Sequence, residues 1–409
     1  MGDVDDAYVL DVVRTPRGRA SARGSLHGLT AIDLVVHLQQ ALVERTGIDP
    51  ERVDDVTLGC ATQVDEQGAD LARTASLVAG WGASVPGVTL NRFCASGIDA
   101  VGQTAARVRA GDLALAVAGG VESVSRVPMF ADRGALYADP ALVRRLGSVH
   151  MGIAADLNAT LEGFTREQLD AYALETQSKA TRARAEGAFA RSLVPVPADD
   201  RGPGLDHDEL VRPGTTAESL ATLAPAFAQL GADGQDAIAL AAANGIRPLD
   251  RIAHLHTVGT SPAVADAAAL VLVGSARAAR TTGLVPRARI VSAASTAVDP
   301  VVMLTAGQSA VEQVLARAGL SPKDIDVFEF AEAFSALCLR FRRDLDAGPD
   351  RMNPDGGTMA MGHAFGATGA ILVGQCVEAL ERRGGRWGVA AVSGAAGLGT
   401  AVLVERVDG

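Results

Sequence analysis

The chain has 409 residues, which is more than one compact domain usually holds, so we expect two or three packed units. Hydrophobic residues make up 48% and charged residues 21%, and the net charge is -11 without a basic run, which excludes a protein that wraps DNA or RNA. No apolar stretch reaches membrane-spanning length, and the acidic first residues (Asp3, Asp5, Asp6) do not form a signal peptide.

Four cysteines, Cys60, Cys94, Cys338 and Cys376, are scattered along the chain without a C-x-x-C pair. This spacing disfavours both a disulfide framework and a zinc site. We therefore expect a reduced, cytoplasmic protein with no bound metal or redox cofactor.

The first third of the chain alternates predicted strands with predicted helices. Thr30 is suited to cap the second of these elements, because Asp33 follows three residues later. The predicted elements are a strand at 8–13, a helix at 30–46, a strand at 56–58, a helix at 72–80 and a strand at 114–118.

The segment Asn91-Arg92-Phe93-Cys94-Ala95-Ser96-Gly97-Ile98 places a cysteine at a strand-to-helix turn, after the extended run 85–90 and before a helix at 99–109. There Cys94 faces the positive end of the helix dipole, which favours the thiolate. Gly97 would let another backbone pack closely. The alternative is that Cys94 is a small buried hydrophobic residue.

The order of elements recurs with an offset of 272 residues. Gly47-Ile48-Asp49-Pro50 corresponds to Gly319-Leu320-Ser321-Pro322, and the segment 97–103 corresponds to 369–375. Two matches at one offset indicate a duplicated α/β unit, with chance similarity as the alternative. The alternation of strands and helices predicts two mainly parallel sheets covered by helices.

The segment between the two copies has a different character. We expect a loop at 129–146, a solvated helix at 165–184 and a proline-, aspartate- and glycine-rich loop at 195–213, with a helix-to-strand segment at 263–273. Such excursions over a rigid scaffold commonly bind substrate. The predicted division is 1–127 plus 246–279 for the N-terminal half, 128–245 for an inserted loop domain and 280–409 for the C-terminal half.

Two glycine-rich runs, 353–369 and 392–400, lie in the C-terminal copy. Glycine at this density lets the backbone present N–H groups to an oxyanion. His363 lies 272 residues after Asn91, so a pseudo-twofold fold would bring it near Cys94, as a base beside a nucleophile. A purely structural histidine is the alternative. A nucleotide-binding loop is disfavoured, because neither G-x-G-x-x-G after a strand nor a Walker lysine is present.

Several segments resemble the thiolases, the acetyl-CoA C-acyltransferases. The resemblance covers nearly the whole chain and rests on NRFCASGIDAV, GGVESVSRVPM, HMGIAADLNA, TREQLDAYALETQSKA and NPDGGTMAMGHAFGATGA. It implies an α/β fold of two βαβαβαββ halves with a loop domain inserted in the first half.

The resemblance also implies roles for single residues. Cys94 would take the acyl group from an acyl-CoA and His363 would activate it, while backbone N–H groups at Cys94 and near Ala395 would form an oxyanion site. RPGTTAESLATLAPAF resembles a coenzyme A-binding run. It gives Arg212, Ser219, Leu223 and Phe227 as coenzyme A contacts, and Met151, Met303 and Phe334 match positions that line the acyl and pantetheine tunnel. The alternative for the apolar residues is plain core packing.

Four departures from the family pattern fall close to the site. Ala331 replaces the usual Asn or His before Glu-Ala-Phe, and Ser393 stands at the second catalytic cysteine, where a hydroxyl is too weak an acid to rest as an anionic base. The turn 259–263 lacks the usual Gly-Asn-x-Ser-Gly pattern, and the segment 228–256 is longer than the family's connection.

The leading interpretation is a coenzyme A-dependent acyltransferase of acyl-CoA and fatty acid metabolism, which cleaves or forms a 3-oxoacyl-CoA through acyl-Cys94. Because of Ser393 and Ala331, two alternatives stay open: a thiolase-like transferase with a more acidic acceptor, and a non-catalytic acyl-CoA-binding subunit. Acyl-CoA thioesters are the expected substrates, and a homodimer or homotetramer is the expected assembly, without nucleic acid or membrane partners.

Overall fold

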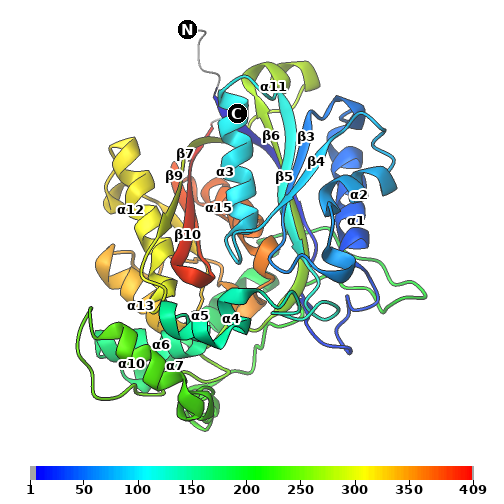
Figure 1. Ribbon diagram of the computed structural model, residues 1–409. Coiled ribbons are helices and arrows are strands. Elements are labelled where there is room, and N and C mark those ends of the chain that lie inside the picture. Colours follow the sequence, from blue (N-terminus) through cyan, green and yellow to red (C-terminus); the bar gives the residue numbers. More distant parts are fainter. Residues whose placement is uncertain (1–5, 408–409) are drawn as a thin grey trace.

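One ten-stranded sheet runs through the molecule in the computed structural model, which describes residues 6–407 (Figure 1). Asp3 and Asp5 of the acidic N-terminus lie outside the described residues. The strands are β1 (Ala7–Arg14), β2 (Gly18–Arg19), β3 (Asp55–Gly59), β4 (Gly87–Leu90), β5 (Leu115–Glu122), β6 (Ala265–Ser275), β7 (Ala288–Ala297), β8 (Val327–Phe330), β9 (Trp387–Ser393) and β10 (Leu398–Arg406).

The sheet order is β4-β3-β5-β6-β1-β7-β10-β9-β8, with β2 paired to β6. The ladders β4–β3, β3–β5 and β9–β8 are parallel, and those between β5 and β9 are antiparallel. The expectation of two separate, mainly parallel sheets is therefore wrong. The halves join edge to edge through β1 and β7, and the antiparallel strands that close each half lie next to this junction.

Helices lie on both faces of this sheet and between its two arms. One arm consists of β4, β3, β5, β6 and β1, and the other of β7, β10, β9 and β8. The first half has α1 (Ala31–Thr46), α2 (Leu71–Val78), α3 (Ser96–Arg109) and α11 (Ala276–Thr282). The second has α12 (Ala306–Ala318), α13 (Ser335–Asp344), α14 (Thr358–Met361) and α15 (Phe365–Arg383). Thr30 caps α1 in a reciprocal capping box with Asp33, as its sequence predicts.

The duplication is visible in the packing. The starts of β5 (Leu115) and β9 (Trp387) are 272 residues apart, and so are those of β3 (Asp55) and β8 (Val327). Helices α3 and α15, which also correspond, pack against each other between the two arms of the sheet (Figure 1). Gly97 permits this contact, because a Cβ there would lie 2.3 Å from the carbonyl oxygen of Gly366.

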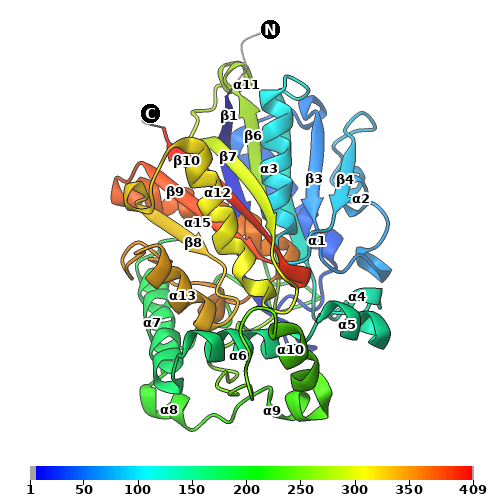
Figure 2. The ribbon, with the colours of Figure 1, turned by 60° about the vertical axis from the view of Figure 1, so that its left-hand side comes forward.

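Most of the remaining helices gather at one end of the molecule, below the sheet in Figure 2. The predicted loop at 129–146 contains two short helices, α4 and α5. The predicted solvated helix, α7, buries one side, including Leu169, Tyr172 and Ala173. These helices are α4 (Ala135–Ala138), α5 (Pro140–Leu146), α6 (Met151–Glu162), α7 (Arg166–Ala185), α8 (Ala217–Ala221), α9 (Ala228–Leu230) and α10 (Asp236–Ala243).

The segment 263–273, expected to pass from helix to strand, is extended almost throughout as part of β6. It is rich in alanine, a good helix former, but every residue of β6 is buried between β5 and β1. Tertiary pairing thus overrides its helix propensity. Within residues 6–407, no helix has the length and apolarity needed to cross a membrane.

Candidate active site

The turn that holds Cys94 is fixed by short-range hydrogen bonds between β4 and α3. Asn91 Oδ1 accepts from the Phe93 N–H at 2.7 Å, and Ser96 Oγ accepts from the Arg92 N–H at 2.7 Å while donating to the Phe93 carbonyl at 2.6 Å. Phe93 adopts a left-handed φ of 51°. Cys94 is therefore held half-buried at the amino end of α3, as the sequence predicts.

The acidity of this thiol differs from the prediction. Burial, together with the negative charge of Glu122, raises the pKa of Cys94 to about 12. The expectation that the amino end of the helix yields a resting thiolate is therefore wrong, because desolvation and a nearby carboxylate outweigh the helix dipole. Cys94 is a protonated thiol in the free protein and needs a base.

Glu122 is a residue that the sequence reasoning missed. Its carboxylate, at the end of β5, accepts from the N–H groups of Ala61 (2.9 Å), Thr62 (3.1 Å) and Gly366 (2.9 Å). It thereby ties the loop after β3 to the first turn of α15. Burial raises the pKa of Glu122, while these hydrogen bonds oppose the shift. The Gly-Gly-Val-Glu run before the loop domain was the available signal, because a Cβ at Gly120 would lie 2.0 Å from the Gly366 carbonyl.

His363 lies in the loop between α14 and α15 and is 5% exposed. Its backbone N–H donates to the Ala263 carbonyl at 2.8 Å, and its Nδ1 lies 2.8 Å from Thr368 Oγ1. Burial and the charge of Arg17 lower the pKa of His363 to about 4. The imidazole is thus neutral near pH 7, and in the tautomer that donates from Nδ1 to Thr368 Oγ1 its Nε2 is available to accept a proton.

The amino ends of α3 and α15 bring the two predicted catalytic regions together. A Cβ at Gly369 would lie 2.3 Å from the Ile98 N, and Cys94 packs on the same apolar cluster as Ala364, the neighbour of His363. Cys94 and His363 share no hydrogen bond in the described part of the chain. Their segments meet across the pseudo-twofold contact, and the two side chains are not a bonded pair.

Ser393 ends β9 and is 1% exposed. Its hydroxyl donates to the Leu304 carbonyl at 2.7 Å and accepts from the Gly307 N–H at 3.0 Å. Both bonds are to backbone at the start of α12. The hydroxyl is therefore engaged as a link between β9 and α12.

Gly394, the next residue, packs against the turn that holds Cys94, called the nucleophile turn below. A Cβ there would lie 3.1 Å from the Arg92 carbonyl and 3.7 Å from the Cys94 N. Within residues 6–407, the N–H groups of Cys94 and Ala395 donate to no protein acceptor. Both N–H groups are therefore available as donors to an oxyanion.

Ala331 and Glu332 directly follow β8. Ala331 is fully buried in the cluster that contains Ala364 and offers no polar atom. Glu332 is fully buried and accepts from Tyr172 Oη at 2.7 Å, from Thr176 Oγ1 at 2.9 Å and from the Met359 N–H at 3.0 Å. Glu332 therefore anchors α7 to the segment before His363.

Three of the four predicted coenzyme A contacts lie together. Arg212, Ser219 and Leu223 line one groove of about 310 Å³. Its inner end includes Ala263, whose carbonyl accepts from the backbone of His363. A Cβ at Gly259 would strike Leu223 Cδ1 at 2.8 Å, so glycine in the turn 259–263 keeps this wall close.

Met151 and Met303 lie in a second cavity of about 300 Å³, which also includes Ala395. Phe227 and Phe334 do not line either cavity. They form an edge-to-face pair with centroids 5.8 Å apart, and Phe227 packs on Gly152 behind the second cavity. Neither cavity is lined by Cys94 or His363 themselves. The first includes Ala263, which bonds the His363 backbone, and the second includes Ala395, the neighbour of Gly394 at the nucleophile turn.

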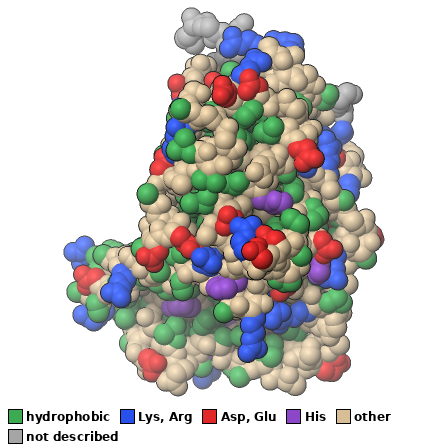
Figure 3. Space-filling model, turned by 90° about the vertical axis from the view of Figure 1, so that its right-hand side faces the viewer, with side chains coloured by type: hydrophobic (Ala, Val, Ile, Leu, Met, Phe, Trp, Pro, Cys, Tyr) green, Lys and Arg blue, Asp and Glu red, His purple; other side chains and the backbone are tan. Residues whose placement is uncertain are grey.

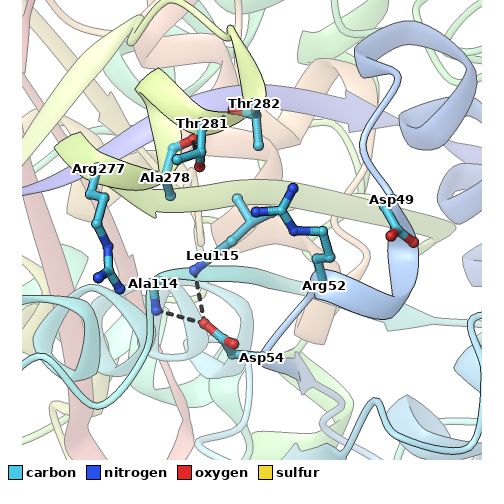
Figure 4. A pocket seen from close by; sticks show the side chains of 9 residues that line it. All are labelled: Asp49, Arg52, Asp54, Ala114, Leu115, Arg277, Ala278, Thr281 and Thr282. Atoms are coloured by element: carbon cyan, nitrogen blue, oxygen red, sulfur yellow. Dashed lines mark hydrogen bonds between the residues drawn. The ribbon is translucent and has the colours of Figure 1, made fainter.

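A hollow of about 480 Å³ lies at the opposite edge of the sheet (Figure 4). Asp54 there accepts hydrogen bonds from the N–H groups of Ala114 and Leu115 at 2.6 and 3.0 Å, so its carboxylate already has partners in the protein backbone. Parallel strands of α/β folds bind ligands at their carboxyl ends, and this hollow lies at the amino ends of β3 and β5. It contains none of the predicted site residues.

The face shown in Figure 3 mixes acidic and basic side chains. No cluster of three or more metal-ligand side chains is present within residues 6–407.

Comparisons with known proteins cover almost the whole chain. Residues 7–234 match the family model "Thiolase, N-terminal domain" and residues 284–406 match "Thiolase, C-terminal domain". A beta-ketoadipyl-CoA thiolase of Pseudomonas aeruginosa is 38% identical over 98% of this chain and 99% of the relative, and a 3-ketoacyl-CoA thiolase of Colwellia psychrerythraea is 36% identical over 99% and 100%.

Among solved structures, the Bacillus anthracis acetyl-CoA acetyltransferase is 30% identical and superposes with a TM-score of 0.85 over 100% of both chains. The sequence and the fold thus agree over their full length, and the chain belongs to the thiolase family.

Proposed function

We propose that the protein uses Cys94 to take an acyl group from an acyl-CoA, with His363 as the base and the N–H groups of Cys94 and Ala395 as the oxyanion site. The acyltransferase class follows from membership of the thiolase family. The observation that supports the residue assignment is the contact between the amino ends of α3 and α15, which brings the segments of Cys94 and His363 together.

Acylation of Cys94 requires a base for the thiol proton, donors for the oxyanion and release of coenzyme A. Cys94 Sγ attacks the thioester carbonyl while His363 Nε2 takes the thiol proton, and the two free N–H groups stabilise the oxyanion. Collapse of the tetrahedral intermediate expels the coenzyme A thiolate, which takes the proton from His363. Because the pKa of Cys94 is raised and that of His363 is lowered, a resting thiolate–imidazolium pair is disfavoured. Proton transfer therefore accompanies attack.

The half-reaction that forms or breaks the carbon–carbon bond has fewer catalytic groups available than the acylation step. Ser393 Oγ is bonded to two backbone groups and Ala331 has no polar atom, so neither serves as a base or holds a water. The family membership and the named relatives favour the cleavage or formation of a 3-oxoacyl-CoA over a different acceptor or a non-catalytic role. We expect Ser393→Cys to raise the rate of condensation, up to a factor of about 10² to 10⁴ for a general base.

The segment 128–245 is proposed as the binding domain. It supplies Arg212 and Ser219 to the coenzyme A groove and Met151 to the acyl cavity, whereas Cys94 and His363 come from the two halves. We also propose that the protein is a homodimer or homotetramer and that it is located in the cytoplasm. Support for a reducing compartment is that all four cysteines are unpaired. Light scattering at several concentrations tests the assembly.

The proposal is tested by the intact mass of the protein after brief exposure to acetyl-CoA. We expect an acetyl adduct that is absent in Cys94→Ala and forms more slowly in His363→Ala. An adduct that persists in Cys94→Ala, or no adduct with acyl-CoA of any chain length, would overturn it.

A further inference from the structure

The acyl cavity combines apolar walls with polar and basic residues. Met303 is buried, Ala395 follows Gly394 at the nucleophile turn, and Arg133 is exposed. No aspartate or glutamate is among the residues that line it. They are Phe130, Arg133, Leu136, Tyr137, Ala138, Val143, Ser148, Val149, His150, Met151, Leu230, Gln235, Met303 and Ala395.

The charge of Arg133 is not neutralised by the protein. Its guanidinium forms no hydrogen bond or ion pair within residues 6–407, unlike most arginines of the chain. The adjacent acid, Asp132, is bonded instead to the hydroxyl of Tyr137. Arg133 also has a left-handed φ of 51°, a costly conformation for a residue other than glycine.

Two further residues that line the cavity, His150 and Gln235, have free hydrogen-bond donors. The Gly152 N–H donates to His150 Nδ1 at 3.1 Å, so the proton of the neutral ring is on Nε2. Burial lowers the pKa of His150, which keeps the ring neutral near pH 7. Gln235 Oε1 accepts from the His150 N–H at 2.9 Å, so the amide NH₂ of Gln235 is free to donate.

A cavity with apolar walls, two free side-chain donors and an unneutralised arginine suits an acyl chain with an anionic end. A carboxylate can accept hydrogen bonds from such groups, whereas a methyl-ended chain can accept none. The identities to relatives named for beta-ketoadipyl-CoA and for 3-ketoacyl-CoA, 38% and 36%, do not separate the two chain types, so the cavity itself must decide.

We propose that the acyl group carried on Cys94 bears a carboxylate at its far end, and that Arg133 is the residue that selects it, with His150 and Gln235 as further donors. This inference rests on the proposed function, because it assigns the acyl group of that same site.

The test measures the rate of acyl-adduct formation on Cys94 by intact mass, so it does not depend on the condensation step. Succinyl-, glutaryl- and adipyl-CoA are compared with butyryl-, pentanoyl- and hexanoyl-CoA of equal chain length. The variants are Arg133→Gln, Arg133→Lys and the control Arg144→Gln. Arg144 is an exposed arginine of α5 that does not line this cavity.

We expect the wild-type protein to favour the carboxylate-ended group at one or more chain lengths by about tenfold or more, the effect of a charge-assisted hydrogen bond. Arg133→Gln should reduce this ratio about tenfold, Arg133→Lys should restore part of it, and Arg144→Gln should leave it unchanged. Melting curves of the variants exclude misfolding as the cause.

A wild-type ratio of one or less at every length would overturn the inference. So would an unchanged ratio in Arg133→Gln or an equal fall in Arg144→Gln. These results differ from a failure of the proposed function, in which acetyl-CoA leaves no adduct on Cys94 at all.

Discussion

Replacement of Ser393 by alanine separates a structural role of this hydroxyl from a catalytic one. The side chain is 1% exposed and bonds the Leu304 carbonyl at 2.7 Å and the Gly307 N–H at 3.0 Å. Ser393→Ala leaves both backbone groups buried without a partner. Each such group costs about 1–3 kcal/mol, so the free energy of unfolding should fall by about 2–6 kcal/mol.

The assay is urea unfolding at one fixed protein concentration, because oligomerisation contributes to stability. Trp81 and Trp387 report the transition by fluorescence, and Trp387 lies in the same strand as Ser393. Ser178→Ala is the matched control, since the Ser178 hydroxyl is exposed on α7 and donates only to the Leu174 carbonyl. That control should change the stability by no more than about 0.5 kcal/mol.

The second readout is the rate of acetyl-adduct formation on Cys94 at low temperature, where the variant remains folded. We expect Ser393→Ala to keep this rate within a few-fold of wild type. The reasoning would be refuted by wild-type stability combined with a loss of adduct as complete as in Cys94→Ala. The hydroxyl would then act in the acylation chemistry.

Three further predictions concern His363, the contact of α3 with α15, and the coenzyme A groove. Burial lowers the pKa of His363 from 6.5 to about 4, so the unfolded chain binds more protons between these values and stability should fall by up to about 3 kcal/mol as the pH drops from 6.5 to 4. His363→Gln should flatten this slope in urea titrations, and equal slopes would contradict the assignment. Gly97→Ala should cost about 1–3 kcal/mol or prevent folding, because its Cβ would lie 2.3 Å from a backbone carbonyl. Gly348→Ala, where a Cβ meets nothing within 4 Å, serves as the control for thermal melts, and similar melting of both would refute the close packing. Arg212→Gln should weaken binding of coenzyme A thioesters about three- to tenfold, with the effect shrinking as salt rises, whereas the exposed Arg383→Gln should not. Isothermal titration at two salt concentrations measures this, and equal binding by both variants would remove Arg212 from the site.

The sequence by itself determined the local elements and the internal duplication. The strand at 56–58, the capped helix from Ala31 and the strand-to-helix turn at Cys94 are where the pattern places them, because capping residues and hydrophobic runs act over a few positions. The 272-residue offset anticipated that α3 and α15 would correspond, and Gly97 anticipated a close backbone contact.

The tertiary structure alone decided how the strands pair and how the site residues ionise. Edge-to-edge joining through β1 and β7 depends on contacts between residues about 280 positions apart, which no local pattern specifies. The raised pKa of Cys94 depends on burial and on Glu122, which is distant from the motif in sequence. Ser393 likewise finds its two backbone partners only when separate segments meet. The same holds for the cavity that contains the unneutralised Arg133. Desolvation and long-range charge are properties of the packed chain, so a motif can name a nucleophile but does not set its pKa.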